Sequence, residues 1–147
     1  MAAYRVSRAE RLYNRGMSGL LRLGLGPKRM TRLTVVGRKS GRSYTTPVTF
    51  VAVDGQRWLV APYGEVAWLK NALAAGTVVV GRGRRRERMD VRQVQPAEAA
   101  PVLREYLRLE PIVRRRFGLE ASDPVEDFER IAPRHPVLRL APIVETR

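Results

Sequence analysis

The chain contains no cysteine and a single histidine, His135, among its 147 residues. The absence of cysteine excludes disulfides, thiolate catalysis and zinc sites with cysteine ligands. A lone histidine between an arginine and a proline is a weak basis for a metal site or a Ser-His-Asp triad, so we expect it to be structural. We therefore predict chemistry without a metal, in a reducing compartment such as the cytoplasm.

Long apolar runs are also missing. No segment of the sequence has the length needed to span a bilayer, and no apolar signal-peptide region follows Met1. These features predict a protein that is soluble or lies on a membrane surface.

Acidic residues are scarce relative to basic ones: 14 Asp and Glu residues stand against 28 Lys and Arg residues, which gives a net charge of +14. Such a surface attracts several kinds of anion, including nucleic acid, acidic lipid and phosphorylated cofactors. Nucleic acid is the least favoured partner, because the interleaved aromatic residues of a base-stacking platform are absent. We therefore predict no specific nucleic-acid partner.

Residues 1–30 are predicted to form an N-terminal amphipathic arm helix, followed by a single domain over residues 31–147. The positions at apolar helical spacing are Leu12, Gly16, Leu20 and Leu23, with arginines distributed among them. A basic amphipathic helix can lie on an anionic membrane surface, and residues 1–28 are the candidate for such a peripheral association. More often such a helix packs its leucines on its own domain, and we favour that interpretation.

Beyond residue 31, short runs rich in β-branched and aromatic residues predict strands. The predicted strands are 33–36, 45–53, 57–60, 77–80, 87–95 and 135–143, and the predicted helices are 66–75, 96–109, 111–117 and 124–131. The pair Asp54-Gly55 is typical of a tight hairpin, and Gly76 is typical of a helix C-terminus. About six strands with helices inserted late predict a mainly β protein with α-helices, built as a small barrel rather than a parallel sheet.

The most informative stretch is a basic turn between two predicted strands. Its sequence is Gly37-Arg38-Lys39-Ser40-Gly41-Arg42-Ser43-Tyr44-Thr45-Thr46-Pro47. The two glycines permit positive φ, and consecutive amides in such a turn can bind an anion. The cations and hydroxyl groups suit phosphate or carboxylate oxygens. The stretch is therefore either a hairpin that binds a phosphate or polycarboxylate tail, or a solvated basic turn.

Two further features follow in the chain. In Val60-Ala61-Pro62-Tyr63-Gly64, small residues and a glycine allow the backbone to approach a ligand closely. Trp68 and Asn71 lie near the start of the next predicted helix, whose N-terminal amides favour an anion. Together with the basic turn, these features could hold a planar ring whose anionic tail meets the cations. The alternatives are that Trp68 packs in the core and that Asn71 faces solvent.

The stretch from Leu33 to Gly41, the Thr45-Thr46-Pro47 sequence and residues 63–71 resemble the deazaflavin-dependent nitroreductase family. This is an actinobacterial group of split β-barrel proteins related to FMN-binding barrels. The resemblance implies an FMN-binding-like split β-barrel and coenzyme F420, an 8-hydroxy-5-deazaflavin that carries a hydride and has a phosphate and an oligoglutamate tail. FMN is the less favoured ligand, because a site built for several carboxylates should prefer the deazaflavin. The short segment before Trp68 resembles the shorter-loop subgroup, so nitroimidazole reduction is not implied.

The resemblance also assigns the coenzyme-binding positions, in three groups. The tail would be bound by Arg38, Lys39 and Ser40. The channel would be lined by Thr45, Thr46 and Pro47. The ring would be flanked and enclosed by Val60, Ala61, Tyr63, Gly64, Trp68 and Asn71. The candidate catalytic proton donors are Tyr63 and, if its side chain faces inward, Tyr44.

The function that follows from the resemblance is reduction of a small hydrophobic acceptor by hydride transfer from the reduced coenzyme. The expected acceptors are a nitro compound, a quinone or an activated alkene. The alternatives are a non-catalytic protein that binds F420 or a fatty acid, and an FMN-binding barrel. Because related barrels are often dimers, a homodimer is a candidate assembly.

Overall fold

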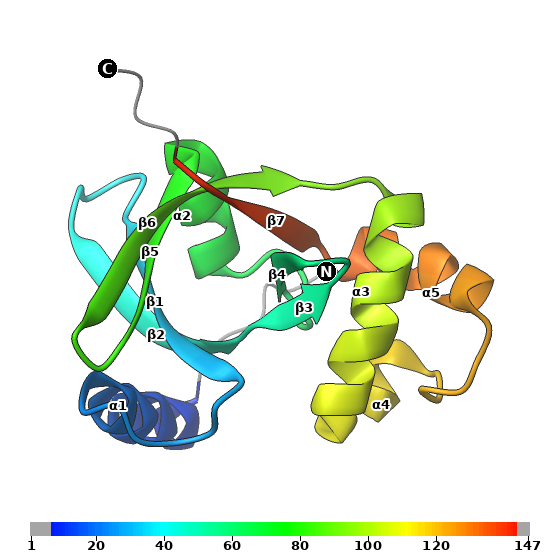
Figure 1. Ribbon diagram of the computed structural model, residues 1–147, viewed down its shortest axis with the longest axis horizontal. Helices are drawn as coiled ribbons and strands as arrows, with labels where there is room; N and C mark the ends of the chain where they lie inside the picture. Colours follow the sequence, from blue (N-terminus) through cyan, green and yellow to red (C-terminus); the bar gives the residue numbers. More distant parts are fainter. Residues whose placement is uncertain (1–6, 144–147) are drawn as a thin grey trace.

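The computed structural model describes residues 7–143, which form a curled antiparallel sheet of seven strands flanked by helices (Figure 1). The strands are β1 (Met30–Val36), β2 (Ser43–Thr49), β3 (Val51–Val53), β4 (Gln56–Val60), β5 (Thr77–Arg82), β6 (Arg85–Gln93) and β7 (Val137–Pro142). The helices are α1 (Arg8–Arg22), α2 (Ala67–Ala75), α3 (Pro96–Leu109), α4 (Arg114–Phe117) and α5 (Val125–Ile131), with 3-10 turns η1 (Pro111–Val113) and η2 (Ala132–Arg134). This arrangement confirms the predicted α+β split barrel.

The sheet curls because two consecutive strands lie at its opposite edges. The strand order is β2-β1-β5-β6-β7-β4-β3, so β2 and β3 are the two edge strands. Only Phe50 separates Thr49, the last residue of β2, from Val51, the first residue of β3. The two edges must therefore approach each other, which bends the sheet into a half-barrel. The prediction of one continuous strand over 45–53 is wrong, since the chain passes from one edge to the other at Phe50.

The predicted turn between β3 and β4 is confirmed. Asp54 has φ of 54° and Gly55 has φ of 72°. Positive φ at both central positions is the geometry that matches the twist of a two-residue hairpin. Gly76 likewise ends α2 in the left-handed conformation, with φ of 74° and its N–H bonded to the Ala72 carbonyl at 2.8 Å.

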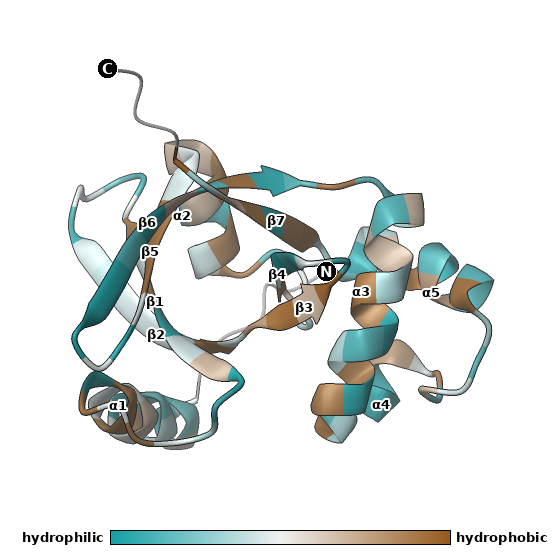
Figure 2. Cartoon of the chain, in the orientation of Figure 1, coloured by the Kyte–Doolittle hydropathy of each residue, from teal (hydrophilic) through white to brown (hydrophobic). Residues whose placement is uncertain are grey.

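Two hydrophobic clusters form the core. One lies within the curled sheet and under α2, and it includes Leu33, Leu59 and Leu69. The other lies between the β3–β4–β7 part of the sheet and the α3–α5 helices, where Leu103 and Phe128 are fully buried. In Figure 2, β3 and β5 are largely apolar, whereas β6 is largely polar. Each cluster therefore has the sheet as one wall, and β6 presents much of its length to solvent.

Helix α1 lies within the predicted arm and packs on the sheet through a narrow contact. Of its leucines, Leu21 is buried, whereas Leu12, Leu20 and Leu23 are 71%, 44% and 73% exposed. The expectation that these leucines pack on the protein itself is wrong for the three exposed ones. The reason is that α1 contacts β1, β2 and β5 with the side that carries Leu21, and its other apolar side faces away from them.

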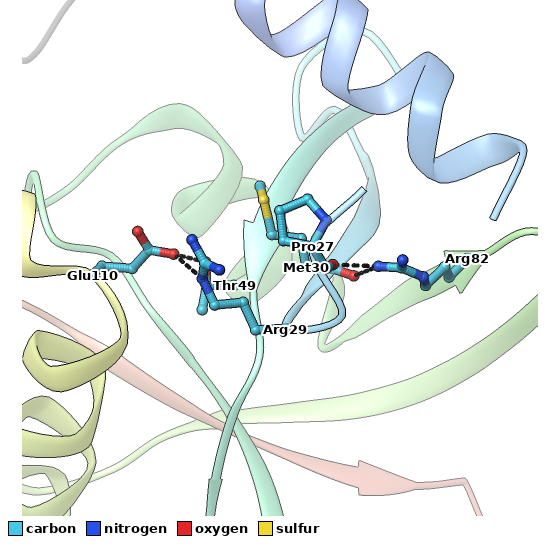
Figure 3. A network of polar contacts seen from close by, with 6 residues as sticks. All are labelled: Pro27, Arg29, Met30, Thr49, Arg82 and Glu110. Carbon is cyan, nitrogen blue, oxygen red and sulfur yellow. Dashed lines mark hydrogen bonds and ion pairs between the residues drawn. The ribbon is translucent and has the colours of Figure 1, made fainter. Parts of the chain in front are cut away.

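Two polar contacts hold the linker between α1 and β1 (Figure 3). The guanidinium of Arg82, in β5, donates to the carbonyl oxygen of Pro27. Glu110, at the end of α3, accepts hydrogen bonds from Arg29 Nε at 2.7 Å and from Thr49 Oγ1 at 2.8 Å. The start of β1 is thus fixed from the sheet and from α3 together.

Residues 1–6 of the predicted arm and residues 144–147 at the C-terminus lie outside the described residues. Within residues 7–143, no helix combines the length and the apolar character needed to cross a membrane.

Candidate functional site

The basic turn is a compact loop, residues 37–42, that joins β1 to β2. The Gly37 N–H donates to the Arg42 carbonyl at 2.7 Å, and the Gly41 N–H donates to the Gly37 carbonyl at 2.9 Å. The Ser40 hydroxyl lies 3.1 Å from the Tyr44 hydroxyl. A Cβ at Gly37 would lie 2.7 Å from both Ser40 Oγ and the Tyr44 ring, so only glycine fits there without a shift. The loop therefore has a defined shape.

The loop is joined to α2 through Asn71. The Asn71 side-chain oxygen accepts the backbone N–H of Arg38 at 3.1 Å and the Arg38 guanidinium at 2.8 Å. Asn71 is only 7% exposed, so the alternative in which it faces solvent is wrong. The partner of Arg38 is a neutral amide, which leaves the charge of the guanidinium uncompensated. Lys39 is exposed and forms no ion pair within residues 7–143.

Strand β2 presents alternate residues to the two faces of the sheet. Tyr44 lies opposite Val35 of β1, and Thr46 lies opposite Leu33. Directly opposed residues of an antiparallel pair share a face, and Val35 and Leu33 are buried in the core. The side chains of Tyr44 and Thr46 therefore lie on the inner face of the curled sheet.

Thr45 and Pro47 lie on the outer face instead. Thr45 is opposite Thr34, with the two hydroxyl oxygens 2.8 Å apart, and Pro47 is opposite Arg32. Of the three residues predicted to line one channel, only Thr46 shares the inner face with Tyr44. The period of two in a strand is the reason for this division.

The segment after β4 contributes both buried and accessible positions. Val60 is 5% exposed and Ala61 is fully buried, with the Ala61 N–H bonded to the Pro136 carbonyl at 2.8 Å. Gly64 has φ of 88°, a conformation that suits glycine. Tyr63 is 39% exposed. Ala61 packs in the inner cluster with Leu59, whereas the side chain of Val60 packs in the other cluster, towards α3 and α5. The accessible positions follow them.

Tyr63 lies against an arginine that comes from a distant part of the chain. The guanidinium of Arg116, in α4, is 4.7 Å from the centroid of the Tyr63 ring, within the range of a cation–π contact. This pairing was not predicted, because Arg116 belongs to a run of three arginines without neighbouring glycines or hydroxyl residues.

His135 holds the same segment through a hydrogen bond to the backbone of Pro62. Its Nδ1 lies 2.8 Å from the Pro62 carbonyl, and because a carbonyl only accepts, Nδ1 carries the proton and donates. The ring centroid is 4.5 Å from that of Phe117. Burial lowers the pKa of His135, an effect that the bond to Pro62 partly offsets. A neutral, buried, hydrogen-bonded imidazole fits the structural role predicted for it.

Trp68 lies in the first turn of α2 and is half-buried. It packs against the inner hydrophobic cluster, next to Val66, which precedes the helix. No side chain caps the N-terminus of α2. The tryptophan thus combines the predicted core contact with a partly accessible ring.

The sequence matches the family model of the F420H2-dependent quinone reductases over residues 6–115. The chain belongs to the F420H2-dependent quinone reductase family. Family membership implies an oxidoreductase with coenzyme F420 as its cofactor. A search of curated protein sequences gave no match.

Solved structures confirm the split-barrel fold of this F420H2-dependent quinone reductase family member. An F420-H2 dependent reductase (FDR-A) aligns with TM-score 0.58 and 20% identity, over 78% of this chain and 95% of the other. A protein described as a domain-swapped dimer aligns with TM-score 0.59 and 19% identity, over 91% and 94% of the two chains. Rv2991 from Mycobacterium tuberculosis aligns with TM-score 0.55 and 16% identity, over 100% and 85%. At such low identities the likeness concerns the fold alone.

The donor set of the 37–42 loop fits the anionic part of coenzyme F420. Phosphate and carboxylate oxygens need cations and hydroxyl donors. Arg38, Lys39 and Ser40 supply both within three consecutive exposed residues. Neither cation is paired with a carboxylate in residues 7–143. The loop can therefore accept an anion without breaking an existing ion pair.

Proposed function

We propose that this protein is an F420H2-dependent reductase whose 37–42 loop binds the phosphate and oligoglutamate tail of the coenzyme. The observation that carries the proposal is the contact of Arg38 with the amide oxygen of Asn71, which holds a charged guanidinium in place without neutralising it. Lys39 and Ser40 would complete the tail site. Arginine binds phosphate and carboxylate groups with two parallel hydrogen bonds. An oligoglutamate tail offers several carboxylates to these donors, whereas FMN offers only its phosphate, and this difference favours the deazaflavin.

The ring of the coenzyme would lie on the inner side, near the segment after β4. Thr46, Tyr63, Gly64 and Trp68 would flank it, with Ala61 forming the packed wall behind. Val60 would contribute through its backbone, since its side chain packs towards α3 and α5. Thr45 and Pro47 would contribute through their backbone, since their side chains lie on the outer face. The bound coenzyme supplies a hydride for the acceptor.

The acceptor that we propose is a small hydrophobic molecule: a quinone, a nitro compound or an activated alkene. Tyr63 is the candidate proton donor because it is accessible and lies two residues after the buried Ala61. Tyr44 is the second candidate, since its hydroxyl lies on the inner face within 3.1 Å of Ser40 Oγ. Either residue would hold a proton near the acceptor, and the chain would otherwise act by positioning the two reactants.

Fluorescence titration with F420 and, in parallel, with FMN tests the proposal. We expect binding of F420 in preference to FMN, and we expect Lys39→Ala to weaken it by about 1–3 kcal/mol, the range for hydrogen bonds to charged groups. Lys28→Ala is the matched control, because Lys28 is an exposed lysine outside the loop. If a folded Arg38→Ala/Lys39→Ala variant binds F420 with unchanged affinity, the loop is not the tail site.

We further propose that α1 lies on an anionic membrane surface. At about 100° per residue, Leu12, Leu20 and Leu23 fall within roughly 80° of one another on the helix. The arginines of α1 form a neighbouring stripe, which consists of Arg8, Arg11, Arg15 and Arg22. An exposed apolar stripe beside a basic one is the pattern of a helix that lies in a lipid interface.

Co-sedimentation with vesicles tests this association. We expect binding to phosphatidylglycerol vesicles, weak binding to phosphatidylcholine, and a loss of about tenfold or more in Leu12→Gln/Leu23→Gln, because each leucine contributes about 1.5 kcal/mol or more on burial. Ile112→Gln is the control, since Ile112 is 83% exposed and lies in η1. Equal vesicle binding by the double variant and the wild type would exclude α1 as the contact.

A homodimer is proposed by analogy with the split-barrel neighbour described as a domain-swapped dimer. Light scattering coupled to size-exclusion chromatography would give twice the 16.6 kDa chain mass for a dimer, and the chain mass itself would refute it.

A further inference from the structure

A second basic site lies on the outer face of the sheet. A groove of about 490 Å³ is formed there by β1, β2, β5, the β5–β6 turn, the start of β6 and the C-terminal end of α1. Four arginines line it: Arg22, Arg32, Arg84 and Arg86. It is separate from the 37–42 loop, none of whose residues lines it. The groove is therefore a concentration of positive charge that the proposed coenzyme site does not use.

These arginines lack the partners that other arginines of the protein have. Arg29 and Arg57, for example, pair with carboxylates at 2.7 Å and 2.9 Å. None of the four groove arginines forms an ion pair within residues 7–143. In addition, the Nε atom of Arg32 is buried and makes no hydrogen bond to the described residues. A buried donor left without a partner is costly, and like charges gathered in one groove repel each other.

The uncharged lining of the groove also suits an anion. Thr34 and Thr45 present their hydroxyl groups 2.8 Å apart, and Ser43 adds a third hydroxyl. Gly81 forms part of the floor, and a Cβ there would lie 2.9 Å from the Arg85 carbonyl. The absence of a side chain at Gly81 leaves the Arg32 guanidinium, 3.8 Å from that position, uncovered on this side.

We propose that this outer groove binds a phosphate group of an anion other than the coenzyme. Arginine forks and hydroxyl donors are the groups that recognise phosphate oxygens, and the groove has room for a phosphate with an attached organic group. The phosphate can come from a soluble phosphorylated molecule or from a lipid headgroup. The second source fits the position of Arg22, which belongs both to the groove and to the basic stripe of α1.

Isothermal titration with inorganic pyrophosphate tests the site. We expect the Arg38→Ala/Lys39→Ala protein, in which the proposed tail site no longer binds the probe, to bind pyrophosphate in the groove. Adding Arg84→Gln/Arg86→Gln to it should weaken that binding at least about tenfold, because two charge-assisted contacts are removed. Arg104→Gln is the control and should bind normally. Arg104 is an exposed residue of α3, a helix that lies away from α1 and the β5–β6 turn (Figure 1). Equal pyrophosphate affinity with and without the groove substitutions would overturn the proposal, and so would absence of binding when the groove is intact.

The coenzyme separates this inference from the proposed function. In Arg38→Ala/Lys39→Ala, F420 binding should fall while pyrophosphate still binds in the groove; in Arg84→Gln/Arg86→Gln, the reverse should hold. If F420 displaces pyrophosphate from the groove, the two sites are one and the proposal fails. Failure of F420 to bind at all would refute the proposed function but leave the groove intact.

Vesicles distinguish the two sources of phosphate. If pyrophosphate competes with phosphatidylglycerol vesicles, and the groove variant binds these vesicles more weakly than Arg104→Gln does, the groove binds a lipid headgroup. If pyrophosphate binds in the groove and vesicle binding is the same in both variants, the ligand is a soluble phosphorylated molecule. Either result supports a phosphate site.

Discussion

Asn71 offers the sharpest test of how the 37–42 loop works. Its side-chain oxygen holds two donors of Arg38, the backbone N–H at 3.1 Å and the guanidinium at 2.8 Å, and the residue is 7% exposed. If the loop binds an anionic tail, Asn71 has two separable effects. It fixes the position of the loop, and as a neutral group it leaves the charge of Arg38 available.

The substitution Asn71→Ala removes both hydrogen bonds. A neutral backbone bond contributes about 0.5–1.5 kcal/mol and a bond to a charged group about 1.5–3 kcal/mol, but the second must be reduced because Arg38 is exposed to solvent. We therefore expect a loss of about 2 kcal/mol in the free energy of unfolding. For a chain of this size that corresponds to a fall of roughly 4–8 °C in Tm.

The substitution Asn71→Asp separates the two effects. A carboxylate has nearly the shape of the amide and still accepts from Arg38, so the loop should keep its position and the protein most of its stability. The new negative charge would neutralise Arg38 and repel the coenzyme tail. We expect F420 affinity to fall in the order wild type, Asn71→Ala, Asn71→Asp, while stability falls in the order wild type, Asn71→Asp, Asn71→Ala.

Thermal unfolding and F420 titration of the three proteins give both orders directly. The titration should be repeated at raised salt, which screens the interaction of exposed charges with the tail. Wild-type affinity in Asn71→Asp would refute the reasoning, because it would show that the charge of Arg38 does not contribute to binding. If affinity instead followed stability across the three proteins, Asn71 would have only a structural role.

Two further predictions concern Gly37, in the same loop, and His135. Gly37→Ala should weaken F420 binding, because the new Cβ would lie 2.7 Å from Ser40 Oγ and the Tyr44 ring and displace both; titration beside a circular-dichroism check of folding measures this. His135 has a pKa below its ordinary value of 6.5 because it is buried, so the unfolded chain binds its proton more readily and stability should fall as the pH drops below about 6.5. His135→Gln, which can still donate to the Pro62 carbonyl, should reduce that pH dependence. If Tm depended on pH in the same way in the wild type and in His135→Gln, from about pH 8 to about pH 5, His135 would not be the group responsible.

The sequence predicted local structure wherever a short signal determines the backbone. Asp54-Gly55 formed the expected hairpin, and Gly76 ended its helix as expected. Both signals act through φ, which the residue itself controls. The split barrel was predicted by resemblance to a family, and the strand pairing agrees with it.

Three features that depend on residues far apart in the chain were not predicted. The break of the predicted 45–53 strand at Phe50 follows from closure of the sheet, to which every strand contributes. The burial of Asn71 depends on the loop that folds over it, and the pairing of Tyr63 with Arg116 joins segments that are distant in sequence. In each case the local sequence fits two environments, and tertiary packing selects one.

The division of β2 between two faces links the proposed coenzyme site with the outer groove. Thr46 and Tyr44 lie on the inner face with the core residues of β1, while Ser43 and Thr45 line the groove on the outer face. The basic, hydroxyl-rich stretch, which is continuous in the sequence, therefore contributes side chains to two surfaces on opposite faces of the sheet. It follows that substitutions of hydroxyl residues on the two faces should weaken binding of different ligands. Thr46→Val should weaken F420 binding and Ser43→Ala should weaken pyrophosphate binding, although the two positions are only three residues apart.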